Sequence, residues 1–471
     1  LIHVKKPESI EFPNASVDSA YLGTANTISV VPGPHCTQEF LKPEFMQQLT
    51  ETEWEVHFNS DRTGVRLMGP TPAWAREDGG EAGLHPSNVH DTAYAVGTID
   101  MTGDMPIIIG PDGPSLGGFV CPATIPSGEL WKYGQLAPGT KVRFNFISIE
   151  TAEKIRKNQE EFLEAVSEGK SVELKKETET QKIEQSYPVL KKVEQDGKDK
   201  LVIRCAGDEY VMVEYGEMEI EMRLRIRVNA LKQAIIEDKR IPLIDATPGI
   251  RSLQIHIDST KLSIRELVNL IVEHDSKIQD LSKFRIKSRK IKMPLSWHDP
   301  QTILAMSRYQ ENVRPNAPWC PDNIEFIRRI NGMKSIEDVK KLIFSATYIV
   351  MGLGDVYLGA PVCIPLDPRQ RLVTTKYNPA RTWTPENAVG IGGAYMGIYG
   401  MEGPGGYQLF GRTIQTWNPK GPTKSFREGK PWLLDFFDQI QFYPVSAEEI
   451  LKIREDFLRD RFNVEVEETV C

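Results

Sequence analysis

The sequence predicts a mainly β fold with α+β features: two barrel-like segments on either side of a small α/β module, with helices at the periphery. Residues 20–148 are rich in Gly and Pro and contain short apolar runs such as Pro106–Ile109, a texture typical of closely spaced strands. The same texture returns from Tyr348 to Tyr443. Because 471 residues exceed what one ordinary core organises, we expect two or more domains.

Changes in composition give the expected domain limits. The first domain is placed at residues 1–168, because an amphipathic helical pattern over residues 150–168 closes it. Residues 169–199 are dominated by Lys, Glu, Gln and Thr, so we interpret them as a solvated linker. The second barrel is placed at residues 294–445, and a closing helix with a tail is expected over residues 446–471.

Residues 200–293 are expected to form the α/β module. Leu201–Cys205 and Tyr210–Tyr215 flank a turn and predict a hairpin. Two helices and two further strands follow; a capping box at Ser263–Glu266 opens the second helix, and the last strand is Lys283–Met293. This β-β-α-β-α-β order fits a small open sheet with helices on one face.

Charge and composition exclude several classes of partner. The formal net charge of -8 gives no general attraction to phosphate backbones, so we expect no nucleic-acid partner. No apolar run reaches the ~20 residues that cross a bilayer, so we expect no membrane association. Six scattered cysteines without a Cys-x-x-Cys pair favour free thiols in a reducing, cytoplasmic location and argue against structural zinc.

The segment from residue 59 to residue 66 is the first candidate for a site. An extended chain would place Asn59 and Asp61 on one face and Arg62 and Arg66 on the other. Two guanidinium groups on one face can hold a carboxylate. The alternative is an Asp–Arg pair that only braces a turn.

Two further loops argue against metal and nucleotide chemistry. Gly83–Asp91 contains two histidines, but Pro86 breaks a helix between them, so we interpret them as loop histidines and predict no metal site. The glycine-rich Gly110–Gly118 lacks the nucleotide-binding patterns, although its backbone can approach a flat ligand closely. With no evident nucleophile elbow or catalytic triad, the chemistry is expected to come from a cofactor while the protein positions the reactants.

The densest polar region lies between Gly352 and Thr413. It combines many glycines with ionisable and amide side chains: Asp355, Lys376, Tyr377, Asn378, Arg381, Gln408 and Arg412. Ordinary barrel turns do not need so many mixed polar groups, so a site is favoured over a scaffold here.

These motifs resemble a known family. Asn59–Gly69 and Gly110–Pro122 resemble the A/B half of the biotin-dependent carboxyltransferase family, which includes paired 5-oxoprolinase and Kip-type subunits. Gly354–Thr413 resembles the C/D half, and longer strings such as Gly83–Asp91 and Ala317–Phe326 resemble the urea carboxylases of the urea amidolyase family. The stretch that opens the A/B half in the family is missing from this sequence, which leaves open whether the first barrel is complete.

The resemblance implies a cyclophilin-like β-barrel in each half and transfer of a carboxyl group from carboxybiotin to urea, which forms allophanate. It implies biotin on a biotinyl carrier domain outside this chain, and ATP only at a separate biotin carboxylase domain; both would be partners, in the same polypeptide or in trans. The alternatives are a Kip-type subunit pair for ATP-driven 5-oxoproline cleavage and a kinase-inhibiting regulatory binding protein.

The resemblance and the polar segments together give a set of candidate site residues, with no metal ligand among them. The candidate catalytic residues are Asp355, Lys376, Arg381 and Asn378. The candidate substrate-binding residues are Asn59, Asp61, Arg62, Arg66, Tyr357 and Tyr377. The candidate cofactor-binding residues are Gly117, Gly118, Gly405, Gly406 and Gln408.

Asp355 yields a first testable prediction, because an acid in a segment otherwise small and apolar needs a fixed partner. We expect Asp355→Ala to lower urea carboxylation at least ~100-fold, about 2.7 kcal/mol, with the thermal midpoint unchanged. A variant that instead loses several degrees of midpoint and keeps its specific activity would assign Asp355 to bracing a turn.

Overall fold

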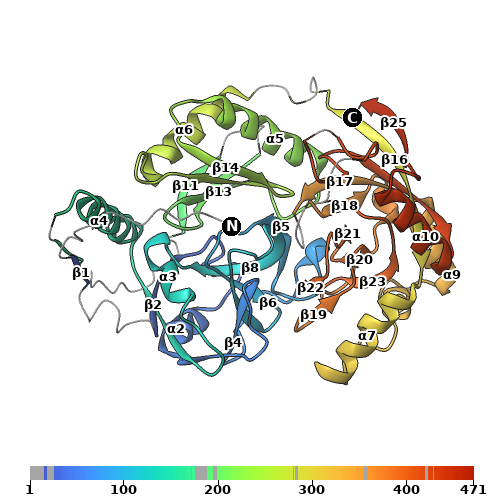
Figure 1. The fold of residues 1–471 in the computed structure, drawn as a ribbon, viewed down its shortest axis with the longest axis horizontal. Helices are drawn as coiled ribbons and strands as arrows, with labels where there is room; N and C mark the ends of the chain where they lie inside the picture. The colour runs from blue at the N-terminus through green and yellow to red at the C-terminus, as the bar shows by residue number, and fades with distance from the viewer. Residues whose placement is uncertain are drawn as a thin grey trace, which may run out of the picture.

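Two β-barrels lie side by side, and a small sheet covered by two helices packs against the first of them (Figure 1). The computed structural model describes residues 15–17, 26–170, 172–174, 188–194, 199–278, 281, 285–354, 359–418, 423–427 and 429–470. In this described part of the chain, no helix is long and apolar enough to span a bilayer.

The first barrel closes on itself. Its strands run in the order β2 (Thr27–Pro32), β9 (Lys141–Phe146), β3 (Trp54–Val56), β4 (Gly64–Met68), β7 (Met105–Ile109), β6 (Thr98–Thr102) and β8 (Leu116–Thr124). Pairing of Val31 with Thr124 joins β2 to β8, and β5 (Asn88–Ala93) extends the sheet beyond β8. The sequence left open whether this barrel is complete, and the strands described here suffice for closure.

The second barrel also closes. Its order is β16 (Lys287–Trp297), β24 (Gln439–Val445), β17 (Thr347–Leu353), β18 (Pro361–Pro365), β21 (Tyr395–Ile398), β20 (Ala388–Gly392) and β23 (Gln408–Arg412), which pairs back to β16. β25 (Glu465–Val470) pairs with the free edge of β16, and β19 (Arg381–Thr384) with β22 (Gly403–Gly405) forms a separate two-stranded sheet.

β16 corrects one expectation from the sequence. The strand pattern over residues 283–293 predicts a last strand of the α/β module, with a domain boundary at residue 293. The strand instead pairs along its length with β24 and β25 of the second barrel. Alternating side chains predict a strand but not its sheet, because both partners come from the far end of the chain.

The α/β module is an antiparallel sheet in the order β11 (Val189–Val193), β12 (Leu201–Cys205), β13 (Tyr210–Tyr215), β15 (Ser252–Ile257) and β14 (Leu243–Pro248). Helices α5 (Met222–Glu237) and α6 (Ile264–Lys277) cover one face and share an apolar core with it. The predicted capping box is present: Ser263 and Glu266 satisfy each other's backbone N–H groups. The other face packs on β5 of the first barrel.

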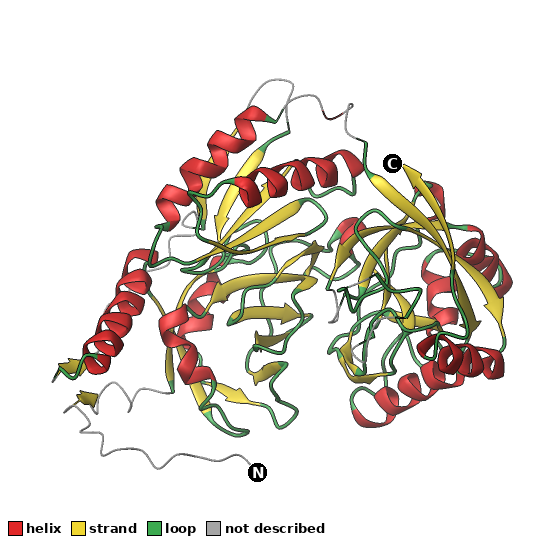
Figure 2. Cartoon of the chain, turned by 45° about the horizontal axis from the view of Figure 1, so that its top comes forward, coloured by secondary structure: helices red, strands yellow, loops and turns green. Residues whose placement is uncertain are grey.

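The remaining helices lie at the periphery of the molecule (Figure 2). They are α2 (Pro43–Glu51), α3 (Leu130–Tyr133), α4 (Ile149–Ser167), α7 (Pro300–Asn312), α8 (Asn323–Ile330), α9 (Ile336–Ser345) and α10 (Ala447–Leu458). Short 3-10 turns are η1 (Gly80–Ala82), η2 (Ser127–Glu129) and η4 (Pro368–Gln370), and β1 (Ala15–Val17) pairs with β10 (Val172–Leu174). The predicted helices over residues 150–168 and after residue 446 correspond to α4 and α10.

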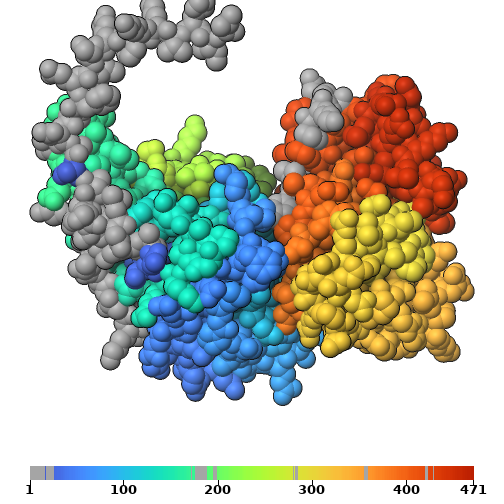
Figure 3. Space-filling model, turned by 60° about the horizontal axis from the view of Figure 1, so that its bottom comes forward, coloured from blue at the N-terminus to red at the C-terminus, as the bar shows by residue number. Residues whose placement is uncertain are grey.

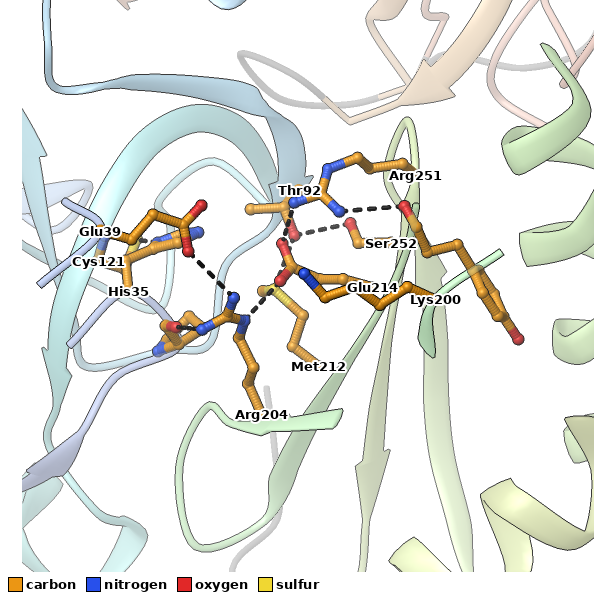
Figure 4. A network of polar contacts seen from close by, with 12 residues as sticks. His35, Glu39, Thr92, Cys121, Lys200, Arg204, Met212, Glu214, Arg251 and Ser252 are labelled. Atoms are coloured by element: carbon orange, nitrogen blue, oxygen red, sulfur yellow. Dashed lines mark hydrogen bonds and ion pairs between the residues drawn. The ribbon is translucent and has the colours of Figure 1, made fainter. Parts of the chain in front are cut away.

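A buried ionic network joins the module to the first barrel (Figure 4). Glu214 accepts hydrogen bonds from Arg204 at 2.5 Å and from Arg251 at 2.9 Å, and all three side chains are buried. Arg204 also donates to the carbonyl oxygen of Pro34, in the first barrel. Next to it, His35 accepts the Cys121 N–H at 2.8 Å, which ties the network to β8.

Glu214 should contribute strongly to stability, because its removal leaves two buried cations facing each other. We expect Glu214→Gln to cost about 3–5 kcal/mol of unfolding free energy at pH 7, measured with guanidinium chloride. Glu217→Gln is the matched control, since the Glu217 side chain is 76% exposed and its pair with Lys200 spans 3.8 Å; it should change stability by less than ~1 kcal/mol.

The effect of Glu214 should depend on pH in a defined direction. Burial alone would raise the pKa of Glu214, but Arg251 and Arg204 outweigh it and hold the pKa at about 2. A lowered folded-state pKa stabilises above the unfolded value and loses its effect as the pH falls towards 2. The difference between wild type and Glu214→Gln should therefore shrink below about pH 4.5. A difference independent of pH would contradict this account.

Candidate active site

A cavity of about 260 Å³ lies where the two barrels meet, and both contribute its walls. The first barrel supplies residues of β4, β6, β7 and β8, and the second supplies residues from 376 to 382 and from 404 to 407. Figure 3 shows the two halves, blue to cyan and orange to yellow, pressed together along this seam. A ligand in the cavity therefore contacts both halves at once.

A buried lysine crosses the seam. Lys376, from the second half, is 3% exposed; its ammonium donates to the Gly118 carbonyl oxygen at 3.0 Å and lies 3.5 Å from Oδ1 of Asp91. The ammonium also lies 4.7 Å from the centre of the Phe119 ring. The carbonyl, carboxylate and aromatic groups around this lysine are favourable partners for an ammonium group at the cavity wall.

Asp91 is held from three sides. Tyr407, in the second half, donates to its Oδ2 at 3.2 Å, and Lys376 lies at Oδ1. The backbone carbonyl oxygen of Asp91 accepts the Ile250 N–H at 2.9 Å, so the α/β module also holds the backbone of Asp91 in place. Burial raises the pKa of Asp91, while Lys376 and Tyr407 oppose that shift. Loss of either charge would leave the other buried without its partner, which is costly.

The backbone around Lys376 is fixed by the second barrel. The Tyr377 N–H donates to the Gly406 carbonyl oxygen at 2.6 Å, and the Tyr377 hydroxyl donates to Asn323 at 2.8 Å. Tyr377 itself is fully buried. The predicted substrate-binding residue Tyr377 thus lies behind the cavity wall and anchors the segment that carries Lys376.

The four predicted cofactor-binding glycines line the cavity for two different reasons. A Cβ on Gly118 would lie 2.2 Å from Oδ1 of Asp91 and 2.3 Å from the Lys376 ammonium, and Cβ atoms on Gly117 and Gly405 would meet tyrosine rings. These three glycines permit close approach. A Cβ on Gly406 would meet only ordinary contacts from 3.5 Å outward, so its missing side chain leaves room in the cavity.

Arg66 brings a second positive group to the cavity. It lies in β4, is 7% exposed, and its guanidinium approaches the Ala380 carbonyl oxygen of the second half at 3.5 Å. Asn59 and Asp61 line the exposed rim on the same side, and Asp61 accepts the N–H of Thr63 at 2.8 Å. The cavity therefore presents cations from both halves to an anionic or strongly polarised ligand.

Four other predicted residues lie outside the cavity. Arg62 is exposed and pairs with Asp112. Asn378 donates to Asp104 at 2.8 Å, which makes a second contact across the seam. Arg381 is fully buried and donates to Thr384, to the carbonyl oxygen of Tyr407 and to the Tyr399 hydroxyl, so it positions Tyr407. Gln408 donates to the Thr375 carbonyl oxygen at 2.9 Å.

Two predicted residues, Asp355 and Tyr357, lie outside the described residues, and their roles stay predictions. Within the described ranges, no three His, Cys, Asp or Glu side chains are grouped as metal ligands would be.

Two carboxyl groups of the first half, those of Asp91 and Asp100, were not among the predicted site residues. Asp91 ends the segment that contains the two loop histidines, and Asp100 lies in a short run between turns. Both belong to strands whose residues are all buried, β5 and β6. The available indication was weak: each acid shares its strand with two apolar residues, Val89 and Ala93 in β5 and Ile99 and Met101 in β6, and a buried carboxyl needs a partner. Tyr94, Phe119 and Tyr407 carry no such indication, because aromatic residues are ordinary in barrel cores.

Two barrels that share one polar cavity define a two-lobed domain whose candidate active site needs both lobes. The sequence matches the family described as "Carboxyltransferase domain, subdomain A and B" over residues 2–146, and "Carboxyltransferase domain, subdomain C and D" over residues 201–426. The chain belongs to this carboxyltransferase-domain family and carries both halves in one polypeptide.

Individual relatives agree with this assignment. The chain is 44% identical over 444 residues to a urea amidolyase of Lachancea kluyveri. The aligned region covers 94% of this chain but only 24% of that relative. It superposes on a Kluyveromyces lactis urea carboxylase with a TM-score of 0.90 at 40% identity, over 98% of this chain and 40% of that one. A 5-oxoprolinase component of Bacillus subtilis is more distant, at 25% identity over 54% of this chain and 97% of its own length.

Gly118 provides a test of the contact across the seam. Gly118→Ala would push a methyl group into the pair of Lys376 and Asp91, so the lysine should leave its position and become accessible. We expect an amine-acylating reagent to label Lys376 in the variant and to leave it protected in wild type, as read by peptide mass mapping. Gly134→Ala is the control, because its Cβ meets one atom at 3.4 Å. Equal protection in all three proteins would contradict the geometry.

Proposed function

We propose that this chain transfers a carboxyl group from carboxybiotin to urea and forms allophanate in the cavity between its two halves. The observation that carries the proposal is Lys376, which reaches from the second half to Gly118 and Asp91 of the first. Carboxyl transfer needs cations where a carboxylate is bound, and Lys376 and Arg66 bring them to one cavity.

The residues present fit the biotin ureido ring. The space left at Gly406 opens onto the cavity, and Ile107, Ile109, Leu116 and Phe119 give it an apolar side for the fused rings. When bound there, carboxybiotin would supply the carboxyl group and a ureido nitrogen able to take a proton from urea.

The chain's own residues would position and polarise the reactants. Lys376 and Arg66 donate hydrogen bonds to the carboxyl or ureido oxygens, where one preorganised donor is worth roughly 3 kcal/mol of barrier. Asp91 and Tyr407 keep Lys376 in place, so the cation does not reorganise during the reaction. Holding both reactants between two rigid barrels contributes several kcal/mol more.

The partners of this reaction are part of the same proposal. Biotin would arrive on a biotinyl carrier domain, and a biotin carboxylase domain would recharge it with ATP, in the same polypeptide or in trans. The length of the chain agrees with this, because it spans 24% of the Lachancea kluyveri relative. We also propose a cytoplasmic location, in keeping with five described cysteines that are all free.

The direct test is transfer from freshly prepared carboxybiotin with a ¹³C-labelled carboxyl group. We expect labelled allophanate by mass spectrometry when urea is the acceptor, with little product from acetamide and none from 5-oxoproline. Transfer to 5-oxoproline in preference to urea would favour the alternative of a 5-oxoprolinase-type pair, and no transfer to any acceptor would favour a binding protein.

Lys376 should be essential to carboxyl transfer, and not only because it neutralises the charge of Asp91. We expect Lys376→Met to lower turnover at least ~100-fold, about 2.7 kcal/mol. The double variant Lys376→Met/Asp91→Asn removes both buried charges, so it should recover the thermal midpoint without recovering activity. Lys424→Met is the control, since the Lys424 side chain is 76% exposed. Recovery of activity in the double variant would show that Lys376 and Asp91 have a purely structural role.

A further inference from the structure

Two buried carboxyl groups of the first barrel lie in different electrostatic surroundings. Asp91 has the Lys376 ammonium 3.5 Å from its Oδ1. Asp100, in β6, is 2% exposed and lines the cavity. Its hydrogen-bond neighbours are the neutral Tyr94 hydroxyl and the Cys121 thiol, whose Sγ lies 3.9 Å from Oδ1. In the described part of the chain, no ion pair joins Asp100 to a lysine or arginine.

A buried carboxyl group without a cation in contact is more stable in its neutral form. Burial raises the pKa of Asp100 to about 8, while Lys376, Tyr94 and Cys121 oppose that shift. Burial raises the pKa of both acids, but Asp91 has a cation in contact, at 3.5 Å from Lys376, and Asp100 has none. A neutral carboxylic acid offers one O–H donor and one carbonyl acceptor side by side.

We propose that Asp100 is a substrate-binding residue, which pairs as a neutral carboxylic acid with the amide-like edge of the substrate in the cavity. Its O–H donates to the substrate carbonyl oxygen, and its own carbonyl oxygen accepts an N–H from the same edge. Urea and small primary amides present this edge. An ionised carboxylate only accepts, so it would face the substrate oxygen with no donor. The inference rests on the proposed function, in which urea is the acceptor.

The side chain of asparagine allows a sharp test, because its amide keeps the size, the donor and the acceptor of a carboxylic acid and does not titrate. With carboxybiotin as donor at pH 7, we expect Asp100→Asn to keep kcat/KM for urea within about 5-fold of wild type. Asp100→Ala should lose at least ~100-fold, mainly through KM, because the paired edge of urea is left without partners.

The pH dependence separates positioning from a structural role. In wild type, KM for urea should rise as the pH passes about 8, where Asp100 loses its proton. In Asp100→Asn, that rise should be absent. Thermal unfolding checks each variant, and Asp100→Thr replaces Asp100→Ala should the alanine variant not fold.

The outcomes decide between the roles of Asp100. If kcat/KM for urea falls as far in Asp100→Asn as in Asp100→Ala, the negative charge or a transferred proton is required. That result would overturn the inference. Unchanged KM in Asp100→Ala would overturn it as well. Wild-type protein that transfers nothing to urea would refute the proposed function itself, and the inference with it, before any variant is compared.

Discussion

The contact of Lys376 with Asp91 and Gly118 is the constraint on which the rest of the site depends. It joins the second half to strands β5 and β8 of the first half, and both side chains are buried although Lys376 also lines the cavity. A buried ion pair stabilises less than its Coulomb energy suggests, but breaking one is expensive. The pair therefore fixes the spacing of the two halves, and with it the width of the cavity.

The other contacts between the halves also fix their position relative to each other. Asn378 pairs with Asp104 across the seam, and Arg371 donates to Glu81 at 2.8 Å. Glu81 also accepts the N–H of Ile220, so three parts of the fold meet at one carboxylate. The α/β module lies far from the cavity along the chain, yet its Ile250 holds the backbone of Asp91. This explains why a small module with no cavity residue of its own belongs to the domain.

Local sequence patterns predicted local structure well. Glycine- and proline-rich strands indicated both barrels, and the capping box at Ser263 opens α6 as expected. Such patterns do not predict which distant strands pair. β16 pairs with strands more than a hundred residues later in the chain, and no local pattern predicts that Val31 and Thr124 pair to close the first barrel. Resemblance supplied the family, because it compares long strings rather than single spacings.

The site was predicted in part for the same reason. Lys376, Arg66 and the four glycines line the cavity, whereas Arg381, Tyr377 and Gln408 support it from behind. A polar residue in a glycine-rich segment indicates a special environment, but the sequence does not show whether it faces the cavity or the core. Asp91 and Asp100 were missed because a single acid in a strand resembles any surface position until the fold buries it.

The central claim is that one cavity, bounded by Lys376 and Arg66 from opposite halves, holds both reactants. The most direct measurement is a crystal structure of this chain with biotin and urea bound together. We expect density for the ureido ring and for urea inside that cavity, within hydrogen-bond distance of Lys376 or Arg66. Density for either molecule at another place on the protein, with this cavity free of both, would contradict it.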